Sequence, residues 1–481
     1  MPIDPSPRPE DGHFDIAVIG AGVVGCAVAR AFAREGARVA VIERGPDILS
    51  GASRANSAIL HTGFDAPADS LELELVKEGR AEYLAIRDGL NLPLVETGAL
   101  VCAWSVAEAA RLEDIAAAAH ANGIDDVRLL AAEEVRRRLP GLGPGLCGAV
   151  EVPGENVIDP WSAPLGYLGE AIGLGARLFR DCEVIAGEFG AGPGGFWELR
   201  TSRGRLHAAA VVNAAGLYGD RVDACLGLPC SFTIRPRKGQ FVVLDKAARR
   251  HVPTILLPVP TEITKGVVVC PTAFGNVLVG PTAEEQEDRT RASVERTILQ
   301  GLLDHAARIV PALAEMPVTA VYAGLRPATE AKQYRVACHA GQGAITLGGI
   351  RSTGLSAALG LARHAVRLHA RFGGGFVAPA AVAPPRMPNL CEDRPRPWQG
   401  AHHGGIVCHC ELVTRGEIEA ALAGPVPPGD FAGLRRRTRA GMGRCQGFHC
   451  NATLAAMTRG RFATPLAVGP TDAETIAEDA P

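Results

Sequence analysis

The hydrophobic pattern near the N-terminus predicts a strand, a helix and a second strand in close succession. An apolar, β-branched run over residues 16–19 leads into a glycine-rich turn, and an alanine-rich segment with helical character follows. A second apolar run, residues 37–42, ends on Glu43. Two strands joined in this way by a helix form a βαβ unit. The pattern therefore predicts an α/β fold with a parallel sheet.

Three glycines at the turn give this unit a candidate function. Gly20 permits the tight strand-to-helix turn, Gly22 lets the backbone approach a pyrophosphate, and Gly25 lets helix and strand pack closely. The helix N-terminus faces the negative charge, and Glu43 can accept hydrogen bonds from a ribose. These residues predict a dinucleotide site; the alternative is a crossover that uses glycine only for packing.

The segment after Glu43 is the first candidate for chemistry. Residues 45–65 are rich in Gly, Ser and Asn, and they carry His61 next to Thr62 and Gly63. Small residues let a backbone lie against a flat ring system, and a histidine there can exchange protons near neutral pH. The alternative is a solvated loop in which His61 is an ordinary polar residue beside a turn.

The middle of the chain alternates between helical and strand patterns. Residues 68–140 are mostly helical in pattern, residues 211–220 are typical of a buried strand running into a glycine turn, and residues 234–285 are typical of an antiparallel sheet. Residues 344–362 repeat the strand–glycine–helix pattern that begins the chain. A second helix that starts at a glycine turn is therefore expected there. The pattern thus predicts two sheets of different kinds.

Residues 373–405 are dominated by Pro and Gly and show neither the period of 2 of a strand nor the period of 3.6 of a helix. This predicts a linker and a domain boundary. Beyond it, cysteines occur as Cys408-x-Cys410 and Cys445-x4-Cys450. Paired thiolates from two loops suit a soft metal centre. The one-residue gap in the first pair is shorter than the usual zinc spacing, which favours a [2Fe–2S] cluster. A zinc knuckle and a set of buried free thiols are the alternatives.

A basic run, residues 435–439, lies between the two cysteine pairs. It has three interpretations: a solvated helix face, a docking surface, or cations that offset the negative charge of a tetrathiolate cluster.

The amino-acid composition of the chain limits the class of protein to which it can belong. The chain has 481 residues, of which 47% are hydrophobic and 21% charged, and its net charge is −3. This is typical of a globular protein and does not indicate nucleic acid as a partner. No apolar run is long enough to span a membrane, and the first residues lack the pattern of a secretory signal. The 13 cysteines are therefore expected to be reduced thiols or metal ligands.

Taken together, the motifs resemble the FAD-dependent D-amino-acid-oxidase-like superfamily. The resemblance rests on the glycine pattern and on SRANSAILHTGFD, VVNAAGL, KGVVVCPTAFGNVLVGPTAEE, AGLRP and GGIRSTGLSAA. Within the superfamily these segments are most similar to the branch of glycerol-3-phosphate dehydrogenases and oxidases and 2-hydroxyglutarate dehydrogenases. The segment CHCE and the later LRRRTRAGMGRCQGFHC resemble the bacterioferritin-associated-ferredoxin-like (BFD-like) [2Fe–2S] domain of anaerobic glycerol-3-phosphate dehydrogenases.

The resemblance implies a division of the chain. Residues 13–372 would form the FAD-dependent oxidoreductase domain, with a Rossmann-like FAD-binding part and an inserted antiparallel-sheet substrate part. The FAD-binding segments would be residues 13–90, 145–228 and 334–372, and the substrate segments residues 91–144 and 229–333. Residues 406–465 would form a small helical [2Fe–2S] domain.

The resemblance also implies roles for individual residues. His61 would be the base that deprotonates a substrate hydroxyl, while Lys265 and Arg326 would bind an anionic substrate group. The residues expected to hold FAD are Gly20, Gly22, Gly25, Glu43, Arg44, Ala55, Asn56, Ser57, Ala215, Gly216, Gly349, Arg351, Ser352, Thr353 and Gly354. Cys408, Cys410, Cys445 and Cys450 would hold the [2Fe–2S] cluster.

A flavin accepts two electrons as hydride, whereas a [2Fe–2S] cluster passes electrons singly, so the combination suits a dehydrogenase with a protein or quinone-linked acceptor. The expected reaction is oxidation of glycerol 3-phosphate, or a similar small anionic alcohol, to the ketone. The electrons would go to a partner protein or to a quinone-linked membrane protein, and the chain is expected in the cytoplasm or held at the inner membrane by that partner. The alternatives are an L-2-hydroxyglutarate dehydrogenase, an opine or amine dehydrogenase, and a non-catalytic electron-transfer module.

Overall fold

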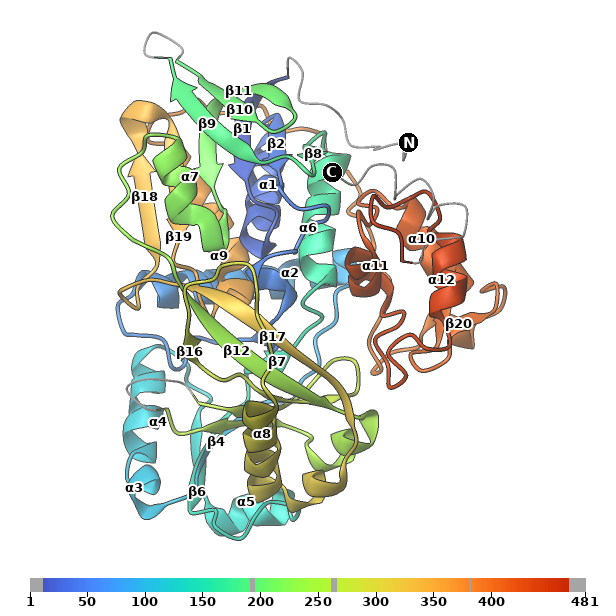
Figure 1. Cartoon of the computed structure of the whole chain (residues 1–481). Helices are drawn as coiled ribbons and strands as arrows, with labels where there is room; N and C mark the ends of the chain where they lie inside the picture. Colours follow the sequence, from blue (N-terminus) through green and yellow to red (C-terminus); the bar gives the residue numbers. More distant parts are fainter. Residues whose placement is uncertain (1–11, 191–194, 261–265, 381, 467–481) are drawn as a thin grey trace.

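The computed structural model describes residues 12–190, 195–260, 266–380 and 382–466. A sheet with parallel strands forms the upper part of Figure 1, a second sheet forms the lower part, and the C-terminal helices lie to one side. Among the helices of these residues, none combines the length and apolar character that a membrane span needs. The 13 cysteines all lie within the described ranges and form no disulfide there.

The first sheet is built around the predicted βαβ unit. Its strands lie in the order β18 (Arg335–His339), β19 (Ala344–Gly348), β11 (Gly204–Asn213), β1 (His13–Ile19), β2 (Val39–Ile42) and β8 (Arg177–Phe179). From β19 to β8 the neighbours pair in parallel, and β10 (Trp197–Thr201) and β9 (Val184–Phe189) extend β11 as antiparallel strands. β2 is buried throughout, which explains its unbroken apolar run, because parallel strands are covered on both faces.

Helices cover both faces of this sheet. α9 (Gly354–His369) packs against α1 (Val23–Glu35) and α2 (Leu71–Leu90), and α6 (Ser162–Gly173) packs against α1. The short α7 (Gly219–Cys225) contacts β9, β11 and β19. Short 3-10 helices complete the connections: η1 (Ala52–Arg54), η2 (Gly216–Tyr218), η3 (Lys246–His251), η4 (Pro311–Glu315), η5 (Ala340–Gln342) and η6 (Pro397–Gln399).

The second sheet gathers strands from two separate stretches of the chain, residues 99–152 and 235–328. Their order is β16 (Glu284–Glu285), β12 (Arg235–Leu244), β15 (Val277–Gly280), β14 (Val268–Pro271), β13 (Ile255–Pro258), β4 (Ala99–Ala103), β6 (Gly148–Val152) and β5 (Arg128–Ala131), and β17 (Val318–Ala328) pairs with β12. Neighbouring strands are antiparallel except for β13 and β4. The flanking helices are α3 (Val106–Ala109), α4 (Leu112–Ala121), α5 (Ala132–Arg138) and α8 (Arg296–Ile309).

Two details of this sheet differ from the sequence pattern. β4 and β5 fall in the region expected to be mostly helical, and β6 belongs to this sheet although the expected FAD-binding segment began at residue 145. β4 is the run ALVCA, buried at every position. A short, fully buried apolar run has no period that separates helix from strand, so pairing with β6 and β13 decides its structure.

A small antiparallel pair, β3 (Ile59–Leu60) and β7 (Asn156–Val157), is separate from both large sheets. Ile59 pairs with Val157, and Leu60 pairs with Asn156. This register places the chain just after β3 beside the chain just before β7.

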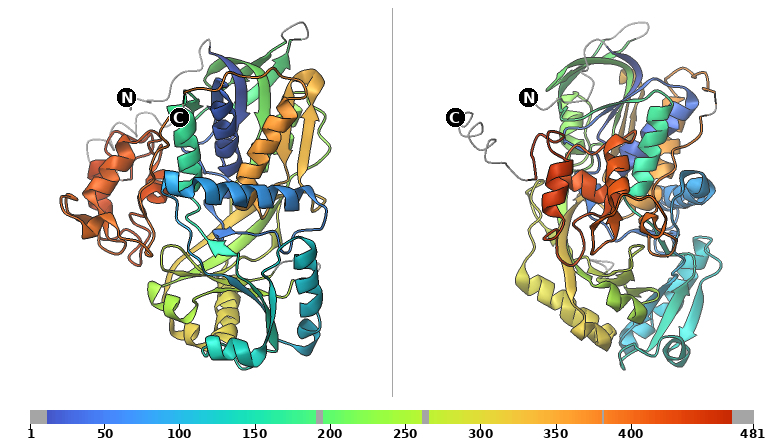
Figure 2. Two further views of the ribbon diagram at one scale, coloured as in Figure 1. Left: turned by 180° about the vertical axis from the view of Figure 1, so that it is seen from behind. Right: turned by 90° about the vertical axis from the view of Figure 1, so that its right-hand side faces the viewer.

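The C-terminal unit contains β20 (Ile406–Cys408), β21 (Val413–Thr414), α10 (Arg415–Ala423), α11 (Phe431–Thr438) and α12 (Asn451–Met457) around a small apolar core. Figure 2 shows this unit lying against the side of the larger part of the molecule. The preceding linker is packed as well: the N–H of Met387 donates to the carbonyl of Leu90 at 2.8 Å, and Cys391 is fully buried. The linker therefore runs along the larger domain rather than free in solution.

Candidate active site and cluster site

A cavity of about 1320 Å³ lies between the carboxyl ends of β1, β2, β11 and β19 and the second sheet. Ligands of open parallel sheets bind at this edge of the strands. Most of the predicted cofactor and substrate residues line the cavity: Gly20, Gly22, Glu43, Arg44, Ala55, Asn56, Ser57, His61, Ala215, Gly216, Arg326, Arg351, Ser352 and Gly354. Gly25, Gly349 and Thr353 are not among its lining residues, and Lys265 lies outside the described residues.

The glycine turn forms one end of the cavity. Gly20 has a φ of +101°, a conformation that suits glycine alone, and a Cβ on Gly25 would lie 1.8 Å from the carbonyl oxygen of Gly20. Gly25 therefore serves the close packing of helix on strand. The first turn of α1 contains no acidic residue, so its positive dipole end can attract a phosphate.

Glu43 lies beneath this turn. Its carboxylate accepts hydrogen bonds from the backbone N–H groups of Ala21 and Gly45, each at 2.8 Å. Burial raises the pKa of Glu43, and these two hydrogen bonds oppose that rise. Arg44 follows, with its guanidinium stacked 3.5 Å from the centre of the Tyr218 ring. The carboxylate therefore braces the turn, and each oxygen keeps a further lone pair that can accept from a ribose.

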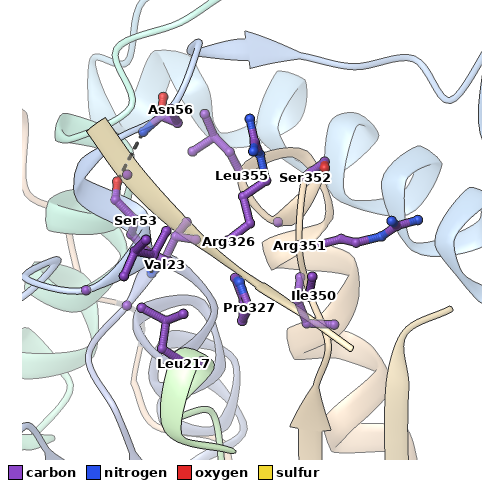
Figure 3. A pocket seen from close by; sticks show the side chains of 18 of the residues that line it. Val23, Ser53, Asn56, Leu217, Arg326, Pro327, Ile350, Arg351, Ser352 and Leu355 are labelled. Atoms are coloured by element: carbon purple, nitrogen blue, oxygen red, sulfur yellow. Dashed lines mark hydrogen bonds between the residues drawn. The ribbon is translucent and has the colours of Figure 1, made fainter. Parts of the chain in front are cut away.

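The opposite end of the cavity is the loop before α9. Figure 3 shows Ile350, Arg351 and Ser352 across the pocket from Ser53 and Asn56. Ser352 and Gly354 at the start of α9 line the cavity, so a second helix N-terminus faces it. The first turn of α9 also lacks acidic residues, which leaves its positive dipole end uncompensated.

Thr353, which we expected beside the flavin, points elsewhere. Its hydroxyl donates to Glu72 at 2.7 Å and contacts the Tyr334 hydroxyl at 2.6 Å, all within the buried interior. Its side chain holds α9 against α2.

His61 extends from the end of β3 into the cavity wall. Its backbone N–H donates to Ser356 Oγ at 2.8 Å, and its Nδ1 lies 2.8 Å from Glu155 Oε2. The side chain of His61 is 18% exposed, whereas that of Glu155 is fully buried. The sequence analysis did not select Glu155, because the acid lies 94 residues further along the chain.

Arg326 reaches the cavity from β17, between the two sides drawn in Figure 3. Its guanidinium donates to the carbonyl of Thr282 at 3.2 Å, and no carboxylate of the described residues pairs with it. Burial, then the charges of Arg237 and Arg351, lower the pKa of Arg326 to about 10. A partly buried cation beside like charges favours an anionic ligand. Arg237 also lines the cavity, although nothing in the local sequence marked it.

These features fit FAD. The cavity runs from a helix N-terminus over a glycine turn, suited to a pyrophosphate, to a second helix N-terminus, suited to the charge of a reduced flavin. Among the lining residues that the sequence analysis missed, Ser53 is notable, because its Oγ accepts the N–H of Val23 at 3.0 Å and so ties the loop around η1 to the start of α1.

The four predicted cluster ligands form two close pairs. The thiol of Cys410 is in hydrogen-bond contact with Cys445, and Cys450 with Cys408. Within the described residues, no three His, Cys, Asp or Glu side chains converge to hold a single metal ion. Two pairs, one for each iron, suit a [2Fe–2S] cluster better than a tetrahedral zinc.

Backbone donors surround these sulfurs. The N–H groups of His449, Gly447 and Phe448 point at Cys445 and, together with Cys410, lower the pKa of its thiol. The N–H of Gly441 donates to Cys408 Sγ at 3.5 Å. Such donors stabilise the negative charge of a cluster held by thiolates.

The basic run is not a solvated face, because Arg436, Arg437 and Arg439 are buried. Arg437 contacts the fully buried Asp47 of the larger domain at 2.6 and 2.9 Å, and Arg436 contacts it at 3.3 Å. Arg439 pairs with Glu411 at 3.0 Å. The run therefore docks the cluster domain against its own chain.

A packed path joins the cluster domain to the cavity wall. The guanidinium of Arg439 lies 4.0 Å from the centre of the Phe274 ring, which stacks on Trp161 at 5.4 Å. Trp161 Nε1 donates to the carbonyl of Arg54, a cavity residue, at 3.4 Å. Arg439 itself lies two residues before the N–H that donates to Cys408.

Comparison with known proteins agrees with this geometry. The FAD dependent oxidoreductase (DAO) family profile matches residues 15–368, and that of the BFD-like [2Fe-2S] binding domain matches residues 406–458. The chain is 31% identical to a glycerol 3-phosphate dehydrogenase of Caloramator mitchellensis, over 91% of this chain and 92% of the relative. It is 25% identical to a subunit of the anaerobic glycerol-3-phosphate dehydrogenase of Escherichia coli (strain K12), over 92% and 87% of the two chains.

Among solved structures, the dithionite-reduced L-alpha-glycerophosphate oxidase of Mycoplasma pneumoniae with FAD bound superimposes with a TM-score of 0.72. The two are 25% identical, and the match covers 79% of this chain and all of the other. The chain therefore belongs to the FAD dependent oxidoreductase family and carries a C-terminal BFD-like domain, with FAD and a [2Fe–2S] cluster as its cofactors.

Proposed function

We propose that the protein oxidises glycerol 3-phosphate to the corresponding ketone and passes the electrons through its cluster to a partner. The observation that carries the proposal is Arg326, a partly buried guanidinium without a carboxylate partner in the described part of the chain, in the same cavity as His61. An anionic substrate would restore the charge balance around Arg326. It would also be held within the cavity whose wall includes His61.

The residues that line the cavity have separate roles in the reaction. Bound FAD supplies a hydride acceptor, so the substrate carbon loses a hydride and its hydroxyl loses a proton. His61 takes that proton, which lets the C–O bond become a carbonyl. Arg326, with Arg237 and Arg351 beside it, binds the phosphate and holds the alcohol carbon in place. The second sheet forms the other wall of the cavity.

The names of the relatives support this substrate. The relatives from Caloramator mitchellensis, Escherichia coli and Mycoplasma pneumoniae described above are all named for glycerol 3-phosphate or its oxidation. Other relatives are a glycine oxidase and an L-2-hydroxyglutarate dehydrogenase. A carboxylate substrate would use the same arginines, so it is the natural competitor in a test.

The cluster domain supports a dehydrogenase with an acceptor other than oxygen. A [2Fe–2S] cluster carries one electron at a time, which suits transfer to another redox protein or to a quinone. The Escherichia coli relative is named as one subunit of its enzyme. We therefore place the acceptor in a separate partner protein, and this chain in the cytoplasm or at the inner membrane through that partner.

Anaerobic bleaching of the flavin tests the substrate. Purified holoenzyme is mixed with glycerol 3-phosphate, L-2-hydroxyglutarate, glycine or glycerol, and the loss of flavin absorbance is followed. We expect rapid bleaching by glycerol 3-phosphate and little by uncharged glycerol. Faster bleaching by either of the other two compounds would refute the proposed substrate.

Replacing the arginine tests how the substrate is bound. Arg326→Met removes a charge-assisted contact worth about 1.5–3 kcal/mol, so kcat/KM for glycerol 3-phosphate should fall roughly 10-fold to 150-fold while the rate with glycerol stays low. Arg200→Met, on the exposed side of β10, is the matched control and should behave as the unmodified enzyme. Equal effects of the two substitutions would remove Arg326 from the substrate site.

A further inference from the structure

The β3–β7 pair brings a second titratable group to the active site. Ile59 pairs with Val157 and Leu60 with Asn156, so one further step in this antiparallel register sets His61 opposite Glu155. The contact is therefore fixed by backbone pairing between segments 94 residues apart in the chain.

The carboxylate of Glu155 is fully buried, and each of its oxygens lies within hydrogen-bond distance of a neighbouring group. Oε1 accepts from the backbone N–H of Thr62 at 2.6 Å and from its hydroxyl at 2.9 Å. Oε2 lies 2.8 Å from Nδ1 of His61. A backbone N–H can only donate, so Oε1 is an acceptor in every protonation state of the site. Because the two donors of Thr62 face Oε1, Oε2 is the oxygen that faces Nδ1 of His61.

We propose that Glu155 is the positioning residue of the active site: it holds the proton of neutral His61 on Nδ1, so that Nε2 is the atom that takes the proton of the substrate hydroxyl. This rests on the proposed function, in which His61 is the base. When the proton reaches Nε2, the imidazolium is stabilised by the carboxylate at its other nitrogen. A carboxylate bonded to a histidine fixes the tautomer and the ring orientation in this way.

The neighbouring Arg80 and Cys270 do not form an ion pair with the Glu155 carboxylate. Arg80 of α2 donates to the carbonyl of Gly154 at 3.1 Å rather than to the carboxylate. Burial raises the pKa of Cys270 on β14, so that thiol is neutral beside Glu155. On the cavity side, Asp65 and Arg326 also line the wall and belong to the same electrostatic environment.

Glu155→Gln gives a sharp test, because the amide has one acceptor and one donor where the acid has two acceptors. The backbone N–H of Thr62 needs the acceptor, so the amide nitrogen must face His61. Nδ1 would then accept a hydrogen bond, and the proton of neutral His61 would move to Nε2. The ring could no longer take a proton at the atom nearest the substrate. Glu155→Asp keeps the charge and should keep the original tautomer.

The primary measurement is independent of turnover. The holoenzyme with oxidised cluster is labelled with ring-15N histidine, and the His61 signals are assigned by their loss in His61→Asn. We expect an Nδ1–H tautomer in the unmodified enzyme and in Glu155→Asp, and an Nε2–H tautomer in Glu155→Gln. His61 should also lose its proton at a lower pH in Glu155→Gln, because the imidazolium has lost its anionic neighbour. An unchanged tautomer and titration in Glu155→Gln would overturn the proposal.

The rate of flavin reduction provides the second readout. In Glu155→Gln the rate of flavin reduction should fall by about 10²-fold to 10⁴-fold, the loss expected when a general base is misplaced. Glu155→Asp should recover part of that rate. Glu170→Gln is the matched control, since Glu170 is also buried but pairs with Arg30 and Arg34, none of which lines the cavity. That variant should lose stability and keep both the tautomer and the rate.

The two proposals fail in different ways. If the unmodified enzyme is not bleached by glycerol 3-phosphate, the proposed substrate is wrong whatever the tautomer shows. If the unmodified enzyme is bleached and Glu155→Gln is bleached at the same rate, Glu155 is not the positioning residue.

Discussion

Asp47 is the residue whose replacement should separate the cluster domain from the flavin domain. It lies in the loop after β2, with no exposed side-chain surface, and it faces Arg436 and Arg437 of α11. These contacts join positions that are 389 and 390 residues apart. Asp47→Asn keeps the size of the side chain and removes its charge. It also turns one of the two acceptors into a donor that faces a guanidinium.

The expected cost follows from burial. Removing one partner of a buried ion pair leaves an uncompensated charge and costs about 3–5 kcal/mol. The comparison within this chain is Asp15, whose partner Arg38 has 66% of its side chain exposed. A surface pair of that kind is worth about 0–1 kcal/mol, so Asp15→Asn is the matched control. The same chemical change should thus differ several-fold in its effect.

Hydrogen–deuterium exchange of the holoenzyme measures this difference directly. The amides of α11 report local opening of the contact between the two domains. In Asp47→Asn their protection should fall by roughly two to four orders of magnitude, the equivalent of about 3–5 kcal/mol, and in Asp15→Asn α11 should be unaffected. Unchanged protection of α11 in Asp47→Asn would show that the apolar contacts, and not the ion pairs, hold the cluster domain in place.

Three further predictions concern the active site and the cluster. His61→Asn should keep its FAD and lower the rate of anaerobic flavin reduction about 10²-fold to 10⁴-fold; an unchanged rate would exclude His61 as the base. Burial and the neighbouring arginines lower the pKa of Arg326 to about 10, so its charge is lost as the pH rises through that value. KM for glycerol 3-phosphate should therefore rise above about pH 10, and a flat KM there would contradict the role of Arg326. Cys445→Ser should abolish the paramagnetic signal of the reduced cluster and leave substrate-driven flavin bleaching nearly intact; full turnover with the physiological acceptor in this variant would mean that electrons leave the flavin directly.

The sequence by itself determined the features whose residues lie close together along the chain. The apolar runs of β1 and β2, the glycines between them and Glu43 all lie within about one βαβ unit, where periodicity and backbone freedom specify the structure. The cysteine pairs were recognisable for the same reason, since their spacing is a local property. The family resemblance then extended these local signals to FAD and the [2Fe–2S] cluster, which the comparisons confirm.

Tertiary structure decided the contacts between distant segments. Glu155 meets His61 only because β3 pairs with β7, and Asp47 meets Arg437 only because α11 lies against the loop after β2. The apolar run of β4 becomes a strand because β6 and β13 lie on either side of it. In each case the local sequence is compatible with several environments. The burial of charge, the pairing of backbone N–H and C=O groups, and the packing of distant side chains select one of them.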